Sequence, residues 1–110
     1  MAGPMQPVVI LCDGTDQLAY TSPSAGGGTI ISTIALVNDT TSPSTTARVR
    51  VLPAGVASTA QDARHTAVPV QNIAPQDVIE IAAPRPIGPG ATVRVMGTAG
   101  QTVQLYGTEF

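Results

Sequence analysis

Residues 46–51 read TARVRV, and polar and apolar side chains alternate strictly along this stretch. Thr46, Arg48 and Arg50 are the polar positions, and the residues between them are alanine and valine. An alternation of period two is typical of a β-strand with one face in a hydrophobic core and the other in polar surroundings. We therefore expect a half-buried strand here, with Arg48 and Arg50 facing water or a partner.

The same alternation recurs near the C-terminus. Val93 and Val95 are expected to point inward with Arg94 outward, and residues 102–105 follow the same rule. Further short apolar or alternating segments lie upstream, separated by turn-forming Gly, Pro, Asn, Asp and Ser. The expected strands are 8–12, 18–21, 29–37, 46–52, 66–70, 77–81, 91–96 and 102–106.

Composition supports the same fold class. The 110 residues include 11 Gly and 10 Pro, which interrupt helices, and the chain is rich in Val, Ile and Thr, which favour strands. Regularly spaced short strands with turns between them are typical of a sandwich or barrel. We predict an all-β fold, a single antiparallel β-sandwich of the jelly-roll or immunoglobulin-like type with about eight short strands.

Residues 29–37, TIISTIALV, break the alternation, because both faces of this strand are apolar. A two-layer sandwich covers only one face of each sheet, so the second face is expected to meet another subunit or the folded-over N-terminal segment. We predict a homo-oligomer. Its predicted interface comprises Ile31, Ala35 and Val37, with Arg48, Arg50 and Arg94 supplying polar or ionic contacts around it.

The N-terminal residues differ in composition from the rest, with early prolines and the triple glycine at 26–28. Two interpretations of residues 1–17 stay open: an N-terminal arm, or the first strand of a hairpin that turns at Asp13 and Gly14. Residues 18–110 are predicted to form the sandwich. We recognise no export signal and no membrane anchor.

Reactive side chains are scarce. His65 is the one histidine and Cys12 the one cysteine, so no internal disulfide is possible and no nucleophilic or metal-binding motif is recognisable. Asp62, three residues before His65, does not complete a ligand set. We predict no catalytic residue, no metal and no cofactor, and thus a protein that is not an enzyme.

Charge and aromatic content argue against two classes of ligand, nucleic acids and sugars. The chain has no lysine and a net charge of −2, which argues against nucleic acid as a ligand. With two Tyr, one Phe and no Trp it also offers few platforms for stacking on a sugar. We expect no nucleic-acid partner and no membrane partner.

From residue 18 onward the order of features resembles small β-sandwich virion proteins of tailed bacteriophages. The resemblance lies in a tyrosine-started strand before a small-residue loop (19–28), an apolar strand that ends in Asn38, the stretch 47–55, two proline-turn strands and the closing residues 103–109. It implies a capsid decoration, or a head or tail accessory protein of fibre-like type. Such a protein is made in the host cytoplasm, resides in the virion and contacts other virion proteins. An adhesion sandwich that binds a host protein or glycan is the main alternative, and a small hydrolase or lyase a third.

Overall fold

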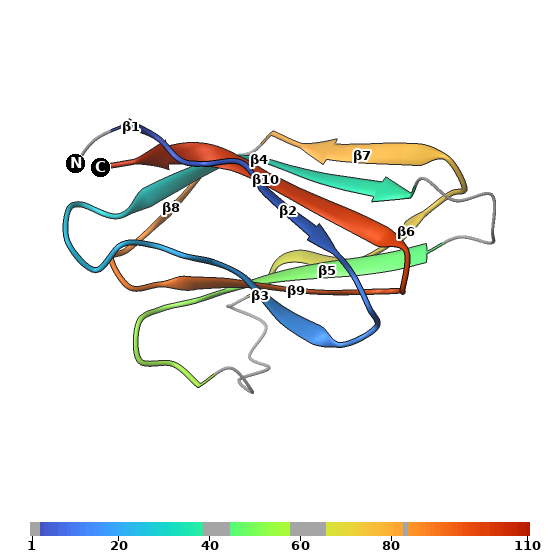
Figure 1. The fold of residues 1–110 in the computed structure, drawn as a ribbon, viewed down its shortest axis with the longest axis horizontal. Helices are drawn as coiled ribbons and strands as arrows, with labels where there is room; N and C mark the ends of the chain where they lie inside the picture. The colour runs from blue at the N-terminus through green and yellow to red at the C-terminus, as the bar shows by residue number, and fades with distance from the viewer. Residues whose placement is uncertain (1–2, 39–44, 58–65, 83) are drawn as a thin grey trace.

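A computed structural model describes residues 3–38, 45–57, 66–82 and 84–110, and the predicted His65 and Asp62 lie outside these ranges. Within them the chain forms ten strands and no helix, arranged in two layers (Figure 1). The strands are β1 (Gly3–Pro4), β2 (Val8–Leu11), β3 (Asp16–Thr21), β4 (Thr29–Asn38), β5 (Thr45–Leu52), β6 (Thr66–Ile73), β7 (Asp77–Ile81), β8 (Arg85–Ile87), β9 (Thr92–Gly97) and β10 (Gln101–Glu109).

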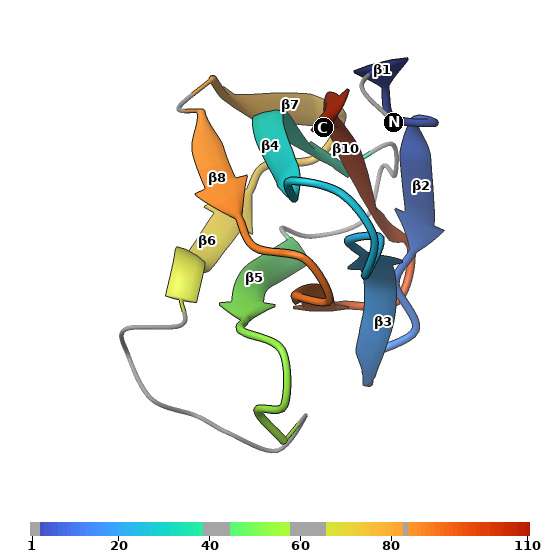
Figure 2. The same ribbon diagram turned by 90° about the vertical axis from the view of Figure 1, so that its left-hand side faces the viewer.

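The strands pair antiparallel in two sheets. In sheet A, β10 and β4 are central, β1 and β2 share the lane beside β10, and β7 and β8 share the lane beside β4. Sheet B has the order β3, β9, β5, β6. Eight lanes in two facing sheets, with the chain crossing repeatedly between them, make this a jelly roll (Figure 2).

The predicted all-β sandwich is thus confirmed, with jelly-roll connections instead of immunoglobulin-like ones. Two short strands were missed, β1 and β8. The segment 84–89 carries three prolines and lies between the expected strands 77–81 and 91–96, yet Arg85–Ile87 pairs with β4. Proline is tolerated there because β8 is an edge strand, whose outward N–H groups need no partner in the sheet.

The N-terminal segment forms neither of the two predicted structures. Strands β2 and β3 lie in different sheets, so the turn at Asp13 and Gly14 is a crossover and not a hairpin. The described residues before it do not extend away as an arm either, since β1 and β2 both pair with β10. Residues 3–11 therefore complete an edge of sheet A.

The core lies between the sheets and follows the predicted alternation in three strands. Val93, Val95, Val103 and Leu105 are buried, and so are the alanine and the first valine of β5. Asn38 closes one end of this core, where its side-chain amide donates hydrogen bonds to the carbonyls of Ile73, the last residue of β6, and of Ala74, both at 3.1 Å. In β5, β9 and β10 the side chains that face the core are thus the ones that the alternation predicted.

Strand β4 departs from its predicted orientation because of a β-bulge. Tyr106 pairs with Thr33 and Gly107 pairs with Ile31, so Ser32 is an extra residue that inverts the facing of everything before it. Ile31 was predicted to lie on the outer face with Ala35 and Val37. Its side chain is instead 2% exposed and belongs to the core. The predicted outward orientation of Ile31, on which its place in the interface depended, is therefore wrong.

Tyr20 ties the two sheets together at one end of the sandwich. A bulge at Ala19 turns this side chain of β3 inward, where its hydroxyl donates to Glu109 Oε2 of β10 at 2.5 Å. The hydroxyl oxygen of Tyr20 also lies 2.9 Å from Thr29 Oγ1 of β4, and Ser22 Oγ lies 2.9 Å from the same Thr29 oxygen. Sheet B is thereby joined to both central strands of sheet A.

Candidate interaction surfaces

The outer face of sheet A carries apolar side chains in three of its four lanes. One row of register partners runs Leu11, Thr102, Val37, Val78 across the four lanes. The next row runs Val9, Gln104, Ala35, Glu80. We call the side chains of Val9, Leu11, Ala35, Val37 and Val78 in these two rows the apolar face.

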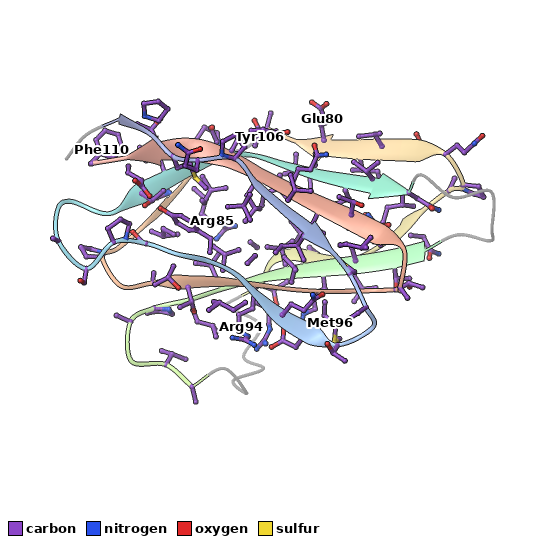
Figure 3. All side chains as sticks on the ribbon, viewed as in Figure 1. Glu80, Arg85, Arg94, Met96, Tyr106 and Phe110 are labelled. Atoms are coloured by element: carbon purple, nitrogen blue, oxygen red, sulfur yellow. The ribbon has the colours of Figure 1, made fainter. Side chains whose placement is uncertain are left out.

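Much of the apolar face is open to solvent. Val9 is 60%, Leu11 66% and Val78 49% exposed, and such exposure is informative where several large aliphatic side chains share one face. Tyr106 extends the surface, with its hydroxyl donating to Gln104 Oε1 at 3.0 Å. Glu80 is the one charged side chain in the two rows, and Figure 3 shows it and Tyr106 pointing outward from sheet A.

Two predicted interface residues, Ala35 and Val37, lie on this apolar face. Ala35 is buried among its larger neighbours and Val37 is half-buried. The sequence analysis missed Val9, Leu11 and Val78, although a signal existed. In the run VVIL at 8–11 both alternate positions are apolar, just as in β4, so both faces of that strand could have been recognised as apolar.

The three predicted arginines do not surround that face. Arg48, Arg50 and Arg94 lie on the outer face of sheet B, on the opposite side of the molecule, where Figure 3 shows Arg94 and Met96. A single patch on one subunit therefore cannot contain both groups. The predicted grouping of these arginines around Ala35 and Val37 is wrong.

Although Arg50 lies on the outer face of sheet B, its side chain is buried, whereas the sequence predicted that it would be exposed. It is 3% exposed, and its guanidinium lies 3.0 Å from Asp16 Oδ2. Arg94 Nε donates to the same carboxylate oxygen at 2.6 Å. One carboxylate thus holds the guanidinium groups of two strands together, which compensates for the burial of a charge.

The other two reactive side chains, Cys12 and Asp13, contribute to the core and to a turn. Cys12 is buried, and burial raises the pKa of its thiol, with the nearby Asp13 carboxylate adding to the shift. Asp13 Oδ1 accepts hydrogen bonds from the backbone and side chain of Thr15, which lowers the pKa of this carboxyl group and closes the crossover turn. Among the described residues no three His, Cys, Asp or Glu side chains are grouped to hold a metal ion.

Comparisons with known proteins support the fold and go no further. No protein-family model and no curated protein matches the sequence. A similar solved structure comes from the Bacillus endospore appendages that form a family of disulfide-linked pili, with a TM-score of 0.50 and 13% sequence identity. The likeness covers 98% of this chain and 82% of that chain. At this identity it shows a shared architecture, and no family membership follows.

Proposed function

We propose that this chain is a structural subunit that assembles with copies of itself into symmetric homo-oligomers through the apolar face. The observation that carries the proposal is the solvent exposure of Val9, Leu11 and Val78 in the two outer lanes of one sheet, where Val78 lies beside Val37. Exposed contiguous apolar surface marks an interaction site in a folded protein, since burying it in an interface releases ordered water.

The fold is compatible with such a role, because a solved structure of similar fold comes from endospore appendages that form pili. Within the structural class we propose a virion protein of a tailed phage, either a capsid decoration or a head or tail accessory protein. The sequence pattern of residues 18–110 supports this finer assignment. The shortage of His, Cys, Lys and aromatic residues supports a role that involves no catalysis.

The apolar face is tested by placing a charge in it. Val9→Asp should reduce the mass of the particle in multi-angle light scattering to that of the monomer, because a carboxylate would be desolvated in the interface. Val70→Asp is the matched control, since Val70 is 62% exposed but lies on an edge strand of sheet B. The proposed interface would be contradicted if Val9→Asp left the mass of the assembly unchanged, or if both variants reduced that mass equally.

The finer assignment needs a separate observation. Immunogold labelling with antibody to this chain should decorate the heads or tails of phage particles released from the host. Labelling of appendages on a cell or spore surface would exclude the virion role and leave the structural role intact. Labelling confined to soluble material in the cytoplasm would oppose both roles.

A further inference from the structure

The sandwich is open along one side, between β8 of sheet A and the end of β5 in sheet B. Strand β6 starts its pairing at Thr66, opposite Arg50, so Val51 and Leu52 extend beyond it. A groove of about 260 Å³ lies there. Its lining side chains are apolar apart from the one charged residue, Arg85, and belong to Val51, Pro53, Ala54, Pro86, Ile87 and Ala91, with Gly88 completing the lining.

Arg85 faces into this opening and not outward from sheet A. It is the register partner of Ile31, whose side chain is in the core, so both point between the sheets, as Figure 3 shows for Arg85. Arg85 is nevertheless exposed, and none of the described strands closes this side. It forms no hydrogen bond or ion pair with any other described residue. A guanidinium without a partner beside a groove is suited to bind an anionic group of a ligand through charge-assisted hydrogen bonds.

The backbone around the groove disfavours a polypeptide strand as the occupant. A peptide that adds to a sheet edge relies on main-chain N–H and C=O groups. Pro86 in the middle of β8 has no N–H, and Pro84 and Pro89 flank the strand. Recognition at this edge must therefore come from side chains, which favours a small molecule.

The walls also select the type of anion. A phosphate or sulfate would place further charged oxygens against apolar walls that offer no second charged donor. A carboxylate needs one bidentate contact with a guanidinium, and its hydrocarbon part fits the rest of the groove. The volume falls just below the roughly 300–1,000 Å³ of pockets for drug-sized ligands, so the fitting ligand is small.

We propose that this groove binds a small organic monocarboxylate with an apolar body, and that Arg85 pairs with its carboxylate. The apolar part would lie against Val51, Ile87 and Ala91. This site is separate from the apolar face, so its occupancy does not depend on the proposed assembly.

The probe is sodium octanoate, titrated into the folded chain while backbone amide shifts are followed by NMR. We expect saturable shifts at Val51, Ile87 and Ala91, and about tenfold weaker binding by Arg85→Gln, as for loss of a charge-assisted hydrogen bond. Arg48→Gln makes the same charge change on the outer face of sheet B and should leave the affinity unchanged. Octylamine, with the same tail and the opposite charge, should bind far more weakly.

Four results would overturn the proposal: no saturable binding, equal affinity for octanol, unchanged affinity in Arg85→Gln, or shifts that map to Val9 and Val78 instead. Because Arg85 is exposed and makes no internal pair among the described residues, Arg85→Gln should retain the melting temperature of the wild type, which separates lost binding from lost folding. The monomeric Val9→Asp variant should bind octanoate like the wild type. Failure of the assembly proposal and failure of the groove proposal are thus distinguishable.

Discussion

Tyr20 shows how much a single side chain contributes to the cohesion of this sandwich. Its one hydroxyl proton goes to Glu109, so Thr29 must donate to the tyrosine oxygen and Ser22 in turn to Thr29. This directed chain of hydrogen bonds joins β3, the loop after it, β4 and β10. Ser22 and Thr29 are both buried, so each needs its partner in the chain.

The pH dependence of Tyr20 follows from the same contacts. Burial raises the pKa of Tyr20, and its hydrogen bond to Glu109 raises it further, while the bond to Thr29 opposes the shift. The folded state therefore holds the phenolic proton more tightly than the unfolded chain, whose phenol titrates near pH 10. The stabilisation is complete below about pH 10 and is lost as the pH rises through the folded-state pKa.

We predict that Tyr20→Phe lowers the free energy of unfolding by about 1 kcal/mol at pH 7. Urea unfolding at pH 7 and at stepwise higher pH measures the difference between the variant and the wild type. This difference should shrink above about pH 10, where the hydrogen-bonded proton is lost. A difference that stays constant with pH would show that Tyr20 acts through packing alone.

At the scale of the strand, Gly107 makes the β4 bulge possible. A Cβ atom at this position would clash with the Ile30 carbonyl oxygen and press on Met5 Sδ at 3.0 Å. The backbone of β10 therefore approaches β4 as closely as only glycine permits. The bulge in turn directs Ile31 into the core.

We predict that Gly107→Ala lowers the free energy of unfolding by about 2–3 kcal/mol, as overpacking does. Gly88→Ala is the matched control, because a Cβ there meets nothing within 4 Å and neither glycine has a positive φ. The control should change stability by less than about 0.5 kcal/mol. Chemical denaturation followed by circular dichroism measures both, and equal effects would remove the special role of Gly107.

The elements differ in how far the sequence could predict them. Strict alternation in β5, β9 and β10 was enough to assign their inward faces. In β4 both faces are apolar, so nothing in the sequence marks Ser32 as the extra residue that moves Ile31 inward. Arg50 was expected outside because its compensation by Asp16 depends on strand pairing between distant segments.

For the whole molecule, the single cysteine limits how subunits can be joined. Two subunits could share one disulfide, but a continuous disulfide-linked polymer needs at least two cysteines in each subunit. Cys12 is also buried, and Gly97 packs directly over its sulfur. These 110 residues therefore cannot form a continuous disulfide-linked polymer.

We predict that the mass of the assembly in light scattering is the same with and without dithiothreitol. The thiol should react slowly with Ellman's reagent in the native state, since burial keeps it protonated and out of reach, and rapidly in urea. Cys12→Ala should assemble like the wild type. Dissociation by the reducing agent would show that the fold opens to expose Cys12 during assembly.

The pairing of β1 with the end of β10 brings Gly3 opposite Glu109, so the chain leaves the sandwich where it began (Figure 1). A fluorescent protein or affinity tag on either end would thus emerge from the same pole of the sandwich. A few linker residues could also splice the two ends, with new ends cut at the exposed turn 53–55. Such a permuted chain would keep every strand neighbour while changing the order in which the strands are synthesised.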